Sequence, residues 1–124
     1  MPKRQKIVAI VENDPNMLRA TRDLLDAHGF ATVVFASAEE FLRRGIAKRV
    51  DCLLLDINLG GMSGIDLRRQ LRASGSPLPI IFMTALEDAA TERRALETGC
   101  VAFLRKPFPQ GALMDAIRRA MAQH

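Results

Sequence analysis

The 124-residue sequence has no hydrophobic run long enough to cross a membrane. Its longest apolar runs, such as Ile7–Val11 and Cys52–Leu55, have the length of a strand, whereas a membrane helix needs about 20 residues. The opening residues lead into an apolar stretch that ends at Glu12, which is too short for the core of a secretion signal. These absences predict a cytoplasmic protein with no membrane partner.

Cysteine is scarce, with two residues in the chain. Cys52 and Cys100 have neither the spacing of metal ligands nor a nearby histidine, so we expect two reduced and mostly buried thiols rather than a redox switch. The net charge of +4 could indicate nucleic acid or anionic lipid as a partner. Most basic residues, however, come in scattered pairs that suit solvated helix faces. We therefore expect no direct binding of nucleic acid.

The order of apolar segments predicts the fold class. Short apolar runs alternate five times with longer amphipathic stretches, a pattern typical of a parallel sheet covered by helices on both faces. The length leaves room for one domain, and 48% hydrophobic residues suffice for a core. We expect a single domain over residues 1–124, with its core from about residue 6 to 121. The predicted strands are 8–11, 31–35, 53–55, 80–82 and 102–105.

Helix signals fall between these strands. Asp14 and Pro15 form an N-cap followed by proline at the first position of a helix that would end near Gly29. Ser37 and Glu40 form a capping box ahead of a second helix. Two further helices are predicted over 64–74 and 88–98, the latter closed by a glycine. In the last helix, four apolar residues share one face: Leu113, Ile117, Ala120 and Met121.

Polar residues occupy the carboxyl ends of four predicted strands, where open parallel sheets bind their ligands. Glu12 and Asn13 follow the first strand. Asp56 ends the third strand, Thr84 ends the fourth, and Lys106 follows the fifth. Each residue alone is most simply a turn former, a helix cap or a solvated lysine. Their joint occurrence at strand ends is much harder to explain by chance.

These residue types suit the transfer of a phosphoryl group to a carboxylate. Oxygen ligands from Glu12, Asn13 and Asp56 suit Mg²⁺. The metal and Lys106 would neutralise the charge of an incoming phosphoryl group, while Asp56 acts as the nucleophile. We also expect Lys106 to keep Asp56 ionised.

Three motifs carry a family resemblance: Leu53–Leu67 around Asp56, Phe82–Ala85 and Phe103–Phe108. Together they resemble the receiver domains of two-component response regulators, and the resemblance covers nearly the whole chain. It implies an α/β, flavodoxin-like fold, with a doubly wound five-stranded parallel sheet of order 2-1-3-4-5. The number of strands comes from the apolar runs, whereas their order follows from the resemblance. The segment Phe35–Leu42 further resembles receivers of the nitrogen-fixation regulator (FixJ-like) type.

The resemblance also implies roles for single residues. Asp56 would be the phospho-acceptor, and Asn58 would provide a metal ligand through its backbone carbonyl. Thr84 would bind the phosphoryl oxygens, and Lys106 would pair with them and form a cis peptide bond with the following proline. Phe103 matches the switch aromatic of the family, although an ordinary core phenylalanine explains it equally well.

The implied partners are a sensor histidine kinase or a phosphotransfer protein, and the implied activity is limited to self-phosphorylation and autodephosphorylation. Signalling would use the surface of the fourth helix, fifth strand and fifth helix, through a homodimer or an effector. Leu86 would shield an acyl phosphate from water, unless it is a surface leucine that opens the fourth helix. The chain would be either a complete single-domain regulator or a receiver from a longer transcription factor.

One position departs from the family pattern. Receivers usually carry two aspartates where this chain has Glu12 and Asn13, and the second is normally the direct metal ligand. Asn13 keeps an oxygen but loses a charge, so we expect a weak Mg²⁺ site. Asp14 adjoins this pair but suits the capping of the first helix better.

Three alternatives remain beside this interpretation. A degenerate receiver would act as a phosphorylation-independent docking module, against which the presence of Asp56, Thr84 and Lys106 argues. A Mg²⁺-dependent phosphatase with an aspartyl nucleophile is disfavoured because Asn58 stands where a second aspartate would follow. A flavin-binding relative is disfavoured because the turn after the first strand has no Ser/Thr/Gly-rich phosphate loop.

Overall fold

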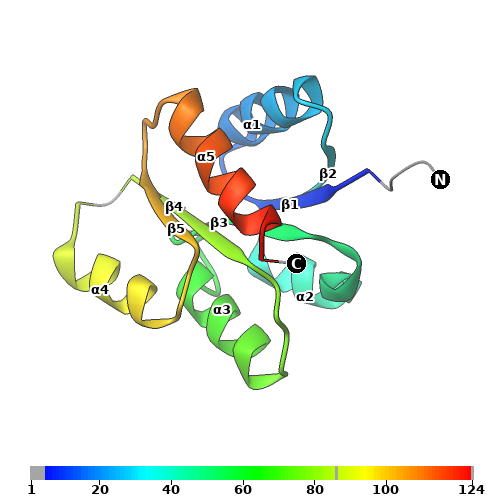
Figure 1. The fold of residues 1–124 in the computed structure, drawn as a ribbon. Helices are drawn as coiled ribbons and strands as arrows, with labels where there is room; N and C mark the ends of the chain where they lie inside the picture. Colours follow the sequence, from blue (N-terminus) through cyan, green and yellow to red (C-terminus); the bar gives the residue numbers. More distant parts are fainter. Residues whose placement is uncertain (1–4, 86, 124) are drawn as a thin grey trace.

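Strands and helices alternate along the chain in the computed structural model, which describes residues 5–85 and 87–123 (Figure 1). The strands are β1 (Ile7–Val11), β2 (Ala31–Phe35), β3 (Cys52–Asp56), β4 (Ile80–Thr84) and β5 (Ala102–Arg105). The helices are α1 (Pro15–Ala27), α2 (Ala38–Arg44), α3 (Gly64–Ala73), α4 (Ala89–Glu97) and α5 (Gln110–Met121), with a short 3₁₀ helix η1 (Ala47–Arg49) before β3. The predicted elements are therefore confirmed, with bounds that differ by a few residues at most.

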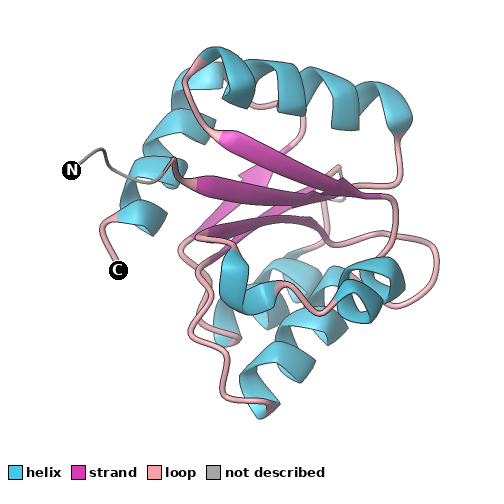
Figure 2. Cartoon of the chain, turned by 90° about the vertical axis from the view of Figure 1, so that its right-hand side faces the viewer, coloured by secondary structure: helices cyan, strands magenta, loops and turns pink. Residues whose placement is uncertain are grey.

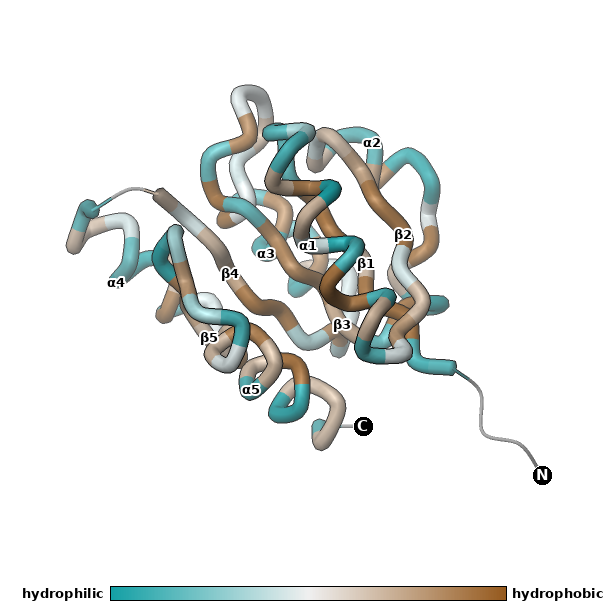
Figure 3. Tube along the Cα trace, turned by 90° about the horizontal axis from the view of Figure 1, so that it is seen from above, coloured by the Kyte–Doolittle hydropathy of each residue, from teal (hydrophilic) through white to brown (hydrophobic). Residues whose placement is uncertain are grey.

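The five strands form one parallel sheet of order β2-β1-β3-β4-β5, which confirms the predicted fold class. Every residue of β3 and β4 is buried, as their continuous apolar runs predicted. Figure 3 shows these hydrophobic strands in the middle of the molecule, between helices of mixed character. The middle of the sheet is thus shielded from water on both faces, whereas β2 and β5 at its edges are partly exposed.

Helices cover both faces of the sheet (Figure 2). On one face, the core includes Phe41 of α2, Leu67 of α3 and Ala95 of α4. On the other face, Leu25 of α1 and Ile117 of α5 pack against the strands. Because side chains of a strand point alternately to opposite faces, each inner strand contributes to both clusters. Within the part of the chain described, no helix is long and apolar enough to span a bilayer.

Capping residues set the ends of the helices where the sequence predicted them. The Asp14 carboxylate accepts a hydrogen bond from the N–H of Asn16 at 2.9 Å at the start of α1. The Ser37 hydroxyl accepts one from the N–H of Glu40 at 3.1 Å at the start of α2. After α4, Gly99 takes a φ of +82°, a conformation that favours glycine. Local chemistry therefore determines where α1 and α2 begin and where α4 ends.

Both cysteines are free thiols, in agreement with the sequence prediction. Cys52 is fully buried in β3, and burial raises its pKa to about 12. Cys100 is half-buried, and burial raises its pKa as well. Neither thiol is therefore activated by its surroundings.

The register of the sheet brings the strand ends to one edge. The last pairs in register are Val11 with Leu55, Asp56 with Met83, and Thr84 with Arg105. Just beyond them, the N–H of Lys106 donates to the carbonyl of Thr84 at 2.8 Å. Polar residues that follow four different strands consequently meet at this edge.

Candidate functional site

A cavity of about 260 Å³ opens at the carboxyl edge of the sheet. Its lining residues are Glu12, Asn13, Asp14, Asp56, Asn58, Ala85 and Lys106. They come from the ends of β1, β3, β4 and β5 and the loops that follow, and most of them are the residues predicted from the sequence. The topology therefore assembles this cavity from segments that are far apart in the chain.

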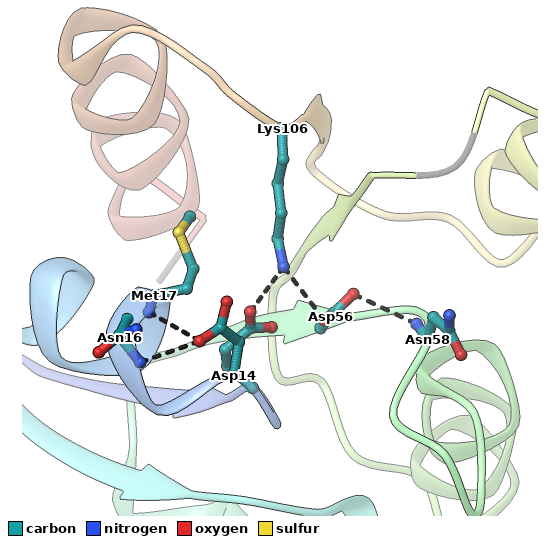
Figure 4. Close-up of polar contacts among 7 residues, drawn as sticks. Asp14, Asn16, Met17, Asp56, Asn58 and Lys106 are labelled. Atoms are coloured by element: carbon teal, nitrogen blue, oxygen red, sulfur yellow. Dashed lines mark hydrogen bonds and ion pairs between the residues drawn. The ribbon is translucent and has the colours of Figure 1, made fainter.

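Lys106 joins two buried carboxylates in the cavity. Its Nζ lies 2.6 Å from Oε1 of Glu12 and 3.1 Å from Oδ2 of Asp56. Figure 4 shows the lysine reaching down to Asp56, with Asn58 on the other side. The N–H of Asn58 donates to Oδ1 of Asp56 at 3.2 Å. Both oxygens of the Asp56 carboxylate thus accept hydrogen bonds.

The site concentrates charge on side chains that are buried or nearly so. The exposed fraction is 1% for Glu12 and 4% for Asp56, and the side chain of Lys106 is 17% exposed. Burial and a hydrogen bond with Asp56 raise the pKa of Glu12 to about 8, although Lys106 opposes this shift. Burial would lower the pKa of Lys106, but its hydrogen bond to Glu12 and the charge of Asp56 raise it above the ordinary value. The lysine is therefore a permanent cation at neutral pH.

The donor set of the cavity suits a hard cation such as Mg²⁺. Oε2 of Glu12 is buried and lacks a hydrogen-bond partner in the described part of the chain. Glu12 and Asp56 supply carboxylate oxygens, and Asn13 and Asn58 add amide or carbonyl oxygens. Among residues 5–85 and 87–123, no three Asp, Glu, His or Cys side chains are arranged to hold a metal. The site thus matches a Mg²⁺ ion that uses two carboxylates and completes its shell with neutral oxygens.

The other predicted residues lie at or near the cavity. Thr84 is fully buried at the end of β4, next to Ala85 in the cavity wall. Phe103 of β5 is half-buried and packs against the core on the α3 and α4 face, outside the cavity. The peptide bond between Lys106 and the following proline is cis, as the resemblance implied. Leu86 lies outside the described residues, so its shielding role stays a prediction.

Two features of the cavity were not predicted from the sequence. Asp14 caps α1 as expected, yet it also lines the cavity. The position of Asp14 directly after Glu12 and Asn13 was the sequence signal that could have predicted its place in the cavity wall. The shorter contact of Lys106 is with Glu12 rather than Asp56, which follows only from the path of the side chains.

Known proteins match this chain along most of its length. It is 35% identical over 121 residues to the response regulator protein TodT of Pseudomonas putida, covering 98% of this chain and 53% of TodT. It is 32% identical over 116 residues to the transcriptional regulatory protein FixJ of Bradyrhizobium diazoefficiens, covering 94% of this chain and 57% of FixJ. The chain thus spans about half the length of these relatives.

Comparison with solved structures finds the same kind of relative. The crystal structure of FixJ-N superposes with a TM-score of 0.86 at 30% identity, covering 97% of this chain and 96% of that one. FixJ proteins are therefore among the relatives, as the segment Phe35–Leu42 indicated. The family profile of the response regulator receiver domain matches residues 8–118. The chain belongs to the response regulator receiver domain family of two-component signalling proteins.

Proposed function

We propose that this receiver domain accepts a phosphoryl group on Asp56 from a sensor histidine kinase or a phosphotransfer protein. The observation that carries the proposal is the buried Asp56 carboxylate, held 3.1 Å from the Lys106 ammonium beside an open cavity. Because receiver domains are signalling domains, the reaction serves to change a surface rather than to turn over a metabolite. We propose residues 1–124 as one receiver unit that works in the cytoplasm.

The residues of the cavity have separate roles in the proposed transfer. An oxygen of Asp56 forms a bond to phosphorus as the bond between phosphorus and the donor nitrogen breaks, and the donor imidazole leaves. Lys106 offsets the charge on the transferred group, and the Thr84 hydroxyl donates a hydrogen bond to one of its oxygens. Asn58 orients the carboxylate through its N–H. Lys106 and the N–H of Asn58 already contact Asp56 before the donor arrives, which reduces the reorganisation that the reaction requires.

Receiver domains generally bind Mg²⁺ at the phosphorylation site. Here Glu12, Asn13, Asp56 and the backbone carbonyl of Asn58 would hold the ion. When bound, it would neutralise negative charge on the phosphoryl oxygens. Since Glu12 has a raised pKa, its carboxyl group would release a proton when it becomes a ligand.

The proposed output surface comprises α4, β5 and α5. Thr84 leads into α4, and Phe103 and Lys106 lie on or after β5, so all three connect the site to this surface. A shift of Thr84 toward the phosphoryl group would open space that Phe103 can fill, and two packings would exchange population. A homodimer or an effector would recognise the second packing. Hydrogen exchange that changes only near α1 and α2 on phosphorylation would contradict this route.

The direct test is incubation with acetyl phosphate and Mg²⁺, followed by intact mass measurement. The wild type should gain the mass of one phosphoryl group, and Asp56→Asn should gain none. Asp66→Asn is a suitable control because Asp66 is an exposed carboxylate on α3, away from the cavity. Phosphorylation that persists in Asp56→Asn would rule out Asp56 as the sole acceptor.

A degenerate receiver that docks partners without phosphorylation is the second candidate function. Asn13 favours it, because the cavity has two carboxylates in hydrogen-bonding range of Lys106 but no third acid arranged for a metal in the described residues. This candidate expects no mass gain at any Mg²⁺ concentration. It also expects partner binding that is unchanged by Asp56→Asn.

A further inference from the structure

The loop between β3 and α3, residues 57–63, forms one wall of the cavity. Asn58 lines the cavity and donates its N–H to Asp56. Further along, a Cβ atom placed on Gly60 would lie 4.0 Å from Nδ2 of Asn13. The loop thus runs from one side of the acceptor carboxylate to the residue that departs from the family pattern. Its position therefore affects both Asn58 and Asn13.

Main-chain hydrogen bonds hold the base of this loop, but among residues 5–85 and 87–123 no main-chain group bonds to its tip, residues 60–62. At the base, the N–H of Ile57 donates to Met83 at 3.0 Å, and the N–H of Gly64 donates to Ile57 at 2.9 Å. At the tip stand Gly60, with a φ of +87°, and the adjacent Gly61. Two consecutive glycines leave the backbone more conformations than any other pair. The tip consequently needs a contact from outside the loop to keep one position.

Glu39, in the first turn of α2, provides that contact. Its Oε2 accepts a hydrogen bond from the N–H of Met62 at 3.0 Å, across 23 positions of the sequence. This bond lowers the pKa of Glu39, so the carboxylate is the form that accepts it. A Cβ atom on Gly61 would lie only 2.6 Å from the same oxygen. The glycine therefore admits the carboxylate to the backbone of the tip.

We propose that Glu39 is a positioning residue for the phosphorylation site, because its carboxylate holds the β3–α3 loop against Asp56 and Asn13. The inference rests on the proposed function. Glu39 does not line the cavity, so it acts through the loop and not on the phosphoryl group. Its loss should disturb the Asn58 carbonyl, which is one of the proposed Mg²⁺ ligands. Outer groups that orient metal ligands commonly affect affinity strongly.

A purely local role of Glu39 in α2 is the competing explanation. A carboxylate in the first turn of a helix favours the helix through the dipole. Glu40 shares that turn and is acidic too, and its backbone N–H bonds to Ser37, away from the loop. Glu40→Ala is therefore the matched control, because it removes the same helix charge and leaves the Glu39 bond to Met62 intact.

The first experiment titrates Mg²⁺ into the metal-free protein and follows the amide resonances of Asn58 and Met62 by NMR. Glu39→Ala should weaken Mg²⁺ binding about 10-fold relative to Glu40→Ala. Glu39→Gln keeps an acceptor oxygen and should lie between them. Gly61→Ala should approach Glu39→Ala, since its methyl group displaces the carboxylate. Unfolding in urea should show similar stability for Glu39→Ala and Glu40→Ala.

The second experiment measures phosphorylation by acetyl phosphate at a range of Mg²⁺ concentrations. Glu39→Ala should need more Mg²⁺ than Glu40→Ala to reach half its maximal rate, and saturating Mg²⁺ should restore most of that rate. Equal Mg²⁺ affinity in Glu39→Ala and Glu40→Ala would overturn the positioning role. Absence of phosphorylation in the wild type would overturn the proposed function instead, because the NMR titration does not depend on phosphoryl transfer.

Discussion

Two buried aspartates flank strand β3 and have different surroundings. Asp51, just before the strand, is 6% exposed, and its Oδ2 accepts a hydrogen bond from the N–H of Ile7 at 2.8 Å. Asp56, at the other end, is 4% exposed and meets Lys106 beside the cavity. The residue type, the strand and the burial are nearly the same. Both also line a cavity, but that of Asp51 includes Val50 and Leu78, whereas that of Asp56 includes Glu12 and Lys106. What differs is the set of groups around each carboxylate, with a side-chain cation beside Asp56 and the main chain of Ile7 beside Asp51.

This difference indicates that Asp51 stabilises the fold, whereas Asp56 is available for chemistry. A main-chain N–H at the start of β1 cannot leave Asp51 without disrupting the edge of the sheet, and the N–H of Asp51 donates back to Ile7. The partner of Asp56 is a side chain that can move to an incoming group. Asp56 also shares its site with Glu12, a second buried carboxyl group. Burial and the neighbouring Asp56 raise the pKa of Glu12, so its ionisation costs free energy. Burial alone therefore does not identify a functional carboxylate.

The largest expected effect is the contrast between a substitution at Asp51 and a substitution at Asp56. Asp51→Ala should lower the free energy of unfolding by about 1–3 kcal/mol, because it leaves the partly buried N–H of Ile7 without its acceptor. The protein that remains folded should still be phosphorylated. Asp56→Asn should lose phosphorylation but keep or gain stability, since one charge beside Glu12 is removed. Urea unfolding and intact mass measure the two outcomes, and a large stability loss in Asp56→Asn would break the comparison.

Lys106→Ala should show that the side-chain partner of Asp56 serves the response to phosphorylation rather than the stability of the fold. The domain should stay folded because Lys106 lies at the edge of a solvent-accessible cavity, but phosphorylation should change the shape of the domain less. Near-identical NMR shift changes on phosphorylation in Lys106→Ala and wild type would count against its role. Arg22→Ala is a useful control, because this arginine pairs with Asp23 on α1, outside the proposed output surface.

Asn13→Asp should tighten Mg²⁺ binding severalfold, because it adds a carboxylate to the cavity. If Glu12 compensates for Asn13 through its longer side chain, Glu12→Gln should nearly abolish binding in the wild-type background. If the ion contacts Glu12 only through water, Glu12→Gln should weaken binding less. Titration of Mg²⁺ against the three proteins decides between these cases. An unchanged affinity in Asn13→Asp would mean that the departure from the family pattern is neutral.

A further expected effect is a pH dependence of the free energy of unfolding to which Glu12 contributes. Its pKa is raised from 4.5 to about 8 in the folded protein, so the folded state binds its proton more tightly. This contribution to stability is complete below pH 4.5 and disappears as the pH rises through about 8. In EDTA, wild type should therefore lose stability over this window relative to Glu12→Gln. Parallel curves from urea unfolding across the pH series would contradict the shift.

Mg²⁺ affinity should also depend on the proton of Glu12, but it should rise with pH where the contribution of Glu12 to stability falls. Mg²⁺ binds the ionised carboxylate, so its affinity should rise with pH until Glu12 is deprotonated near pH 8. Glu12→Gln should remove most of this rise. Asp51 has its main-chain partner in every condition, and Asp51→Asn should leave the pH dependence of Mg²⁺ binding unchanged.

Much of the fold could be predicted because its signals are local. Continuous apolar runs marked β3 and β4 as strands that are buried on both faces, and the structure agrees. Asp14 and Ser37 marked the starts of two helices through short-range hydrogen bonds. The locations of Asp56, Thr84 and Lys106 at one edge then followed, because parallel strands bring their carboxyl ends together.

The sequence by itself thus determined the order of elements, the sheet and the set of polar residues at its carboxyl edge. The tertiary structure alone decided which of those residues touch. Lys106 approaches Glu12 more closely than Asp56, Asp14 lines the cavity while it caps α1, and Glu39 reaches the backbone of Met62. These contacts join segments that lie far apart in the chain. They depend on side-chain paths and burial, which no local pattern of residues encodes.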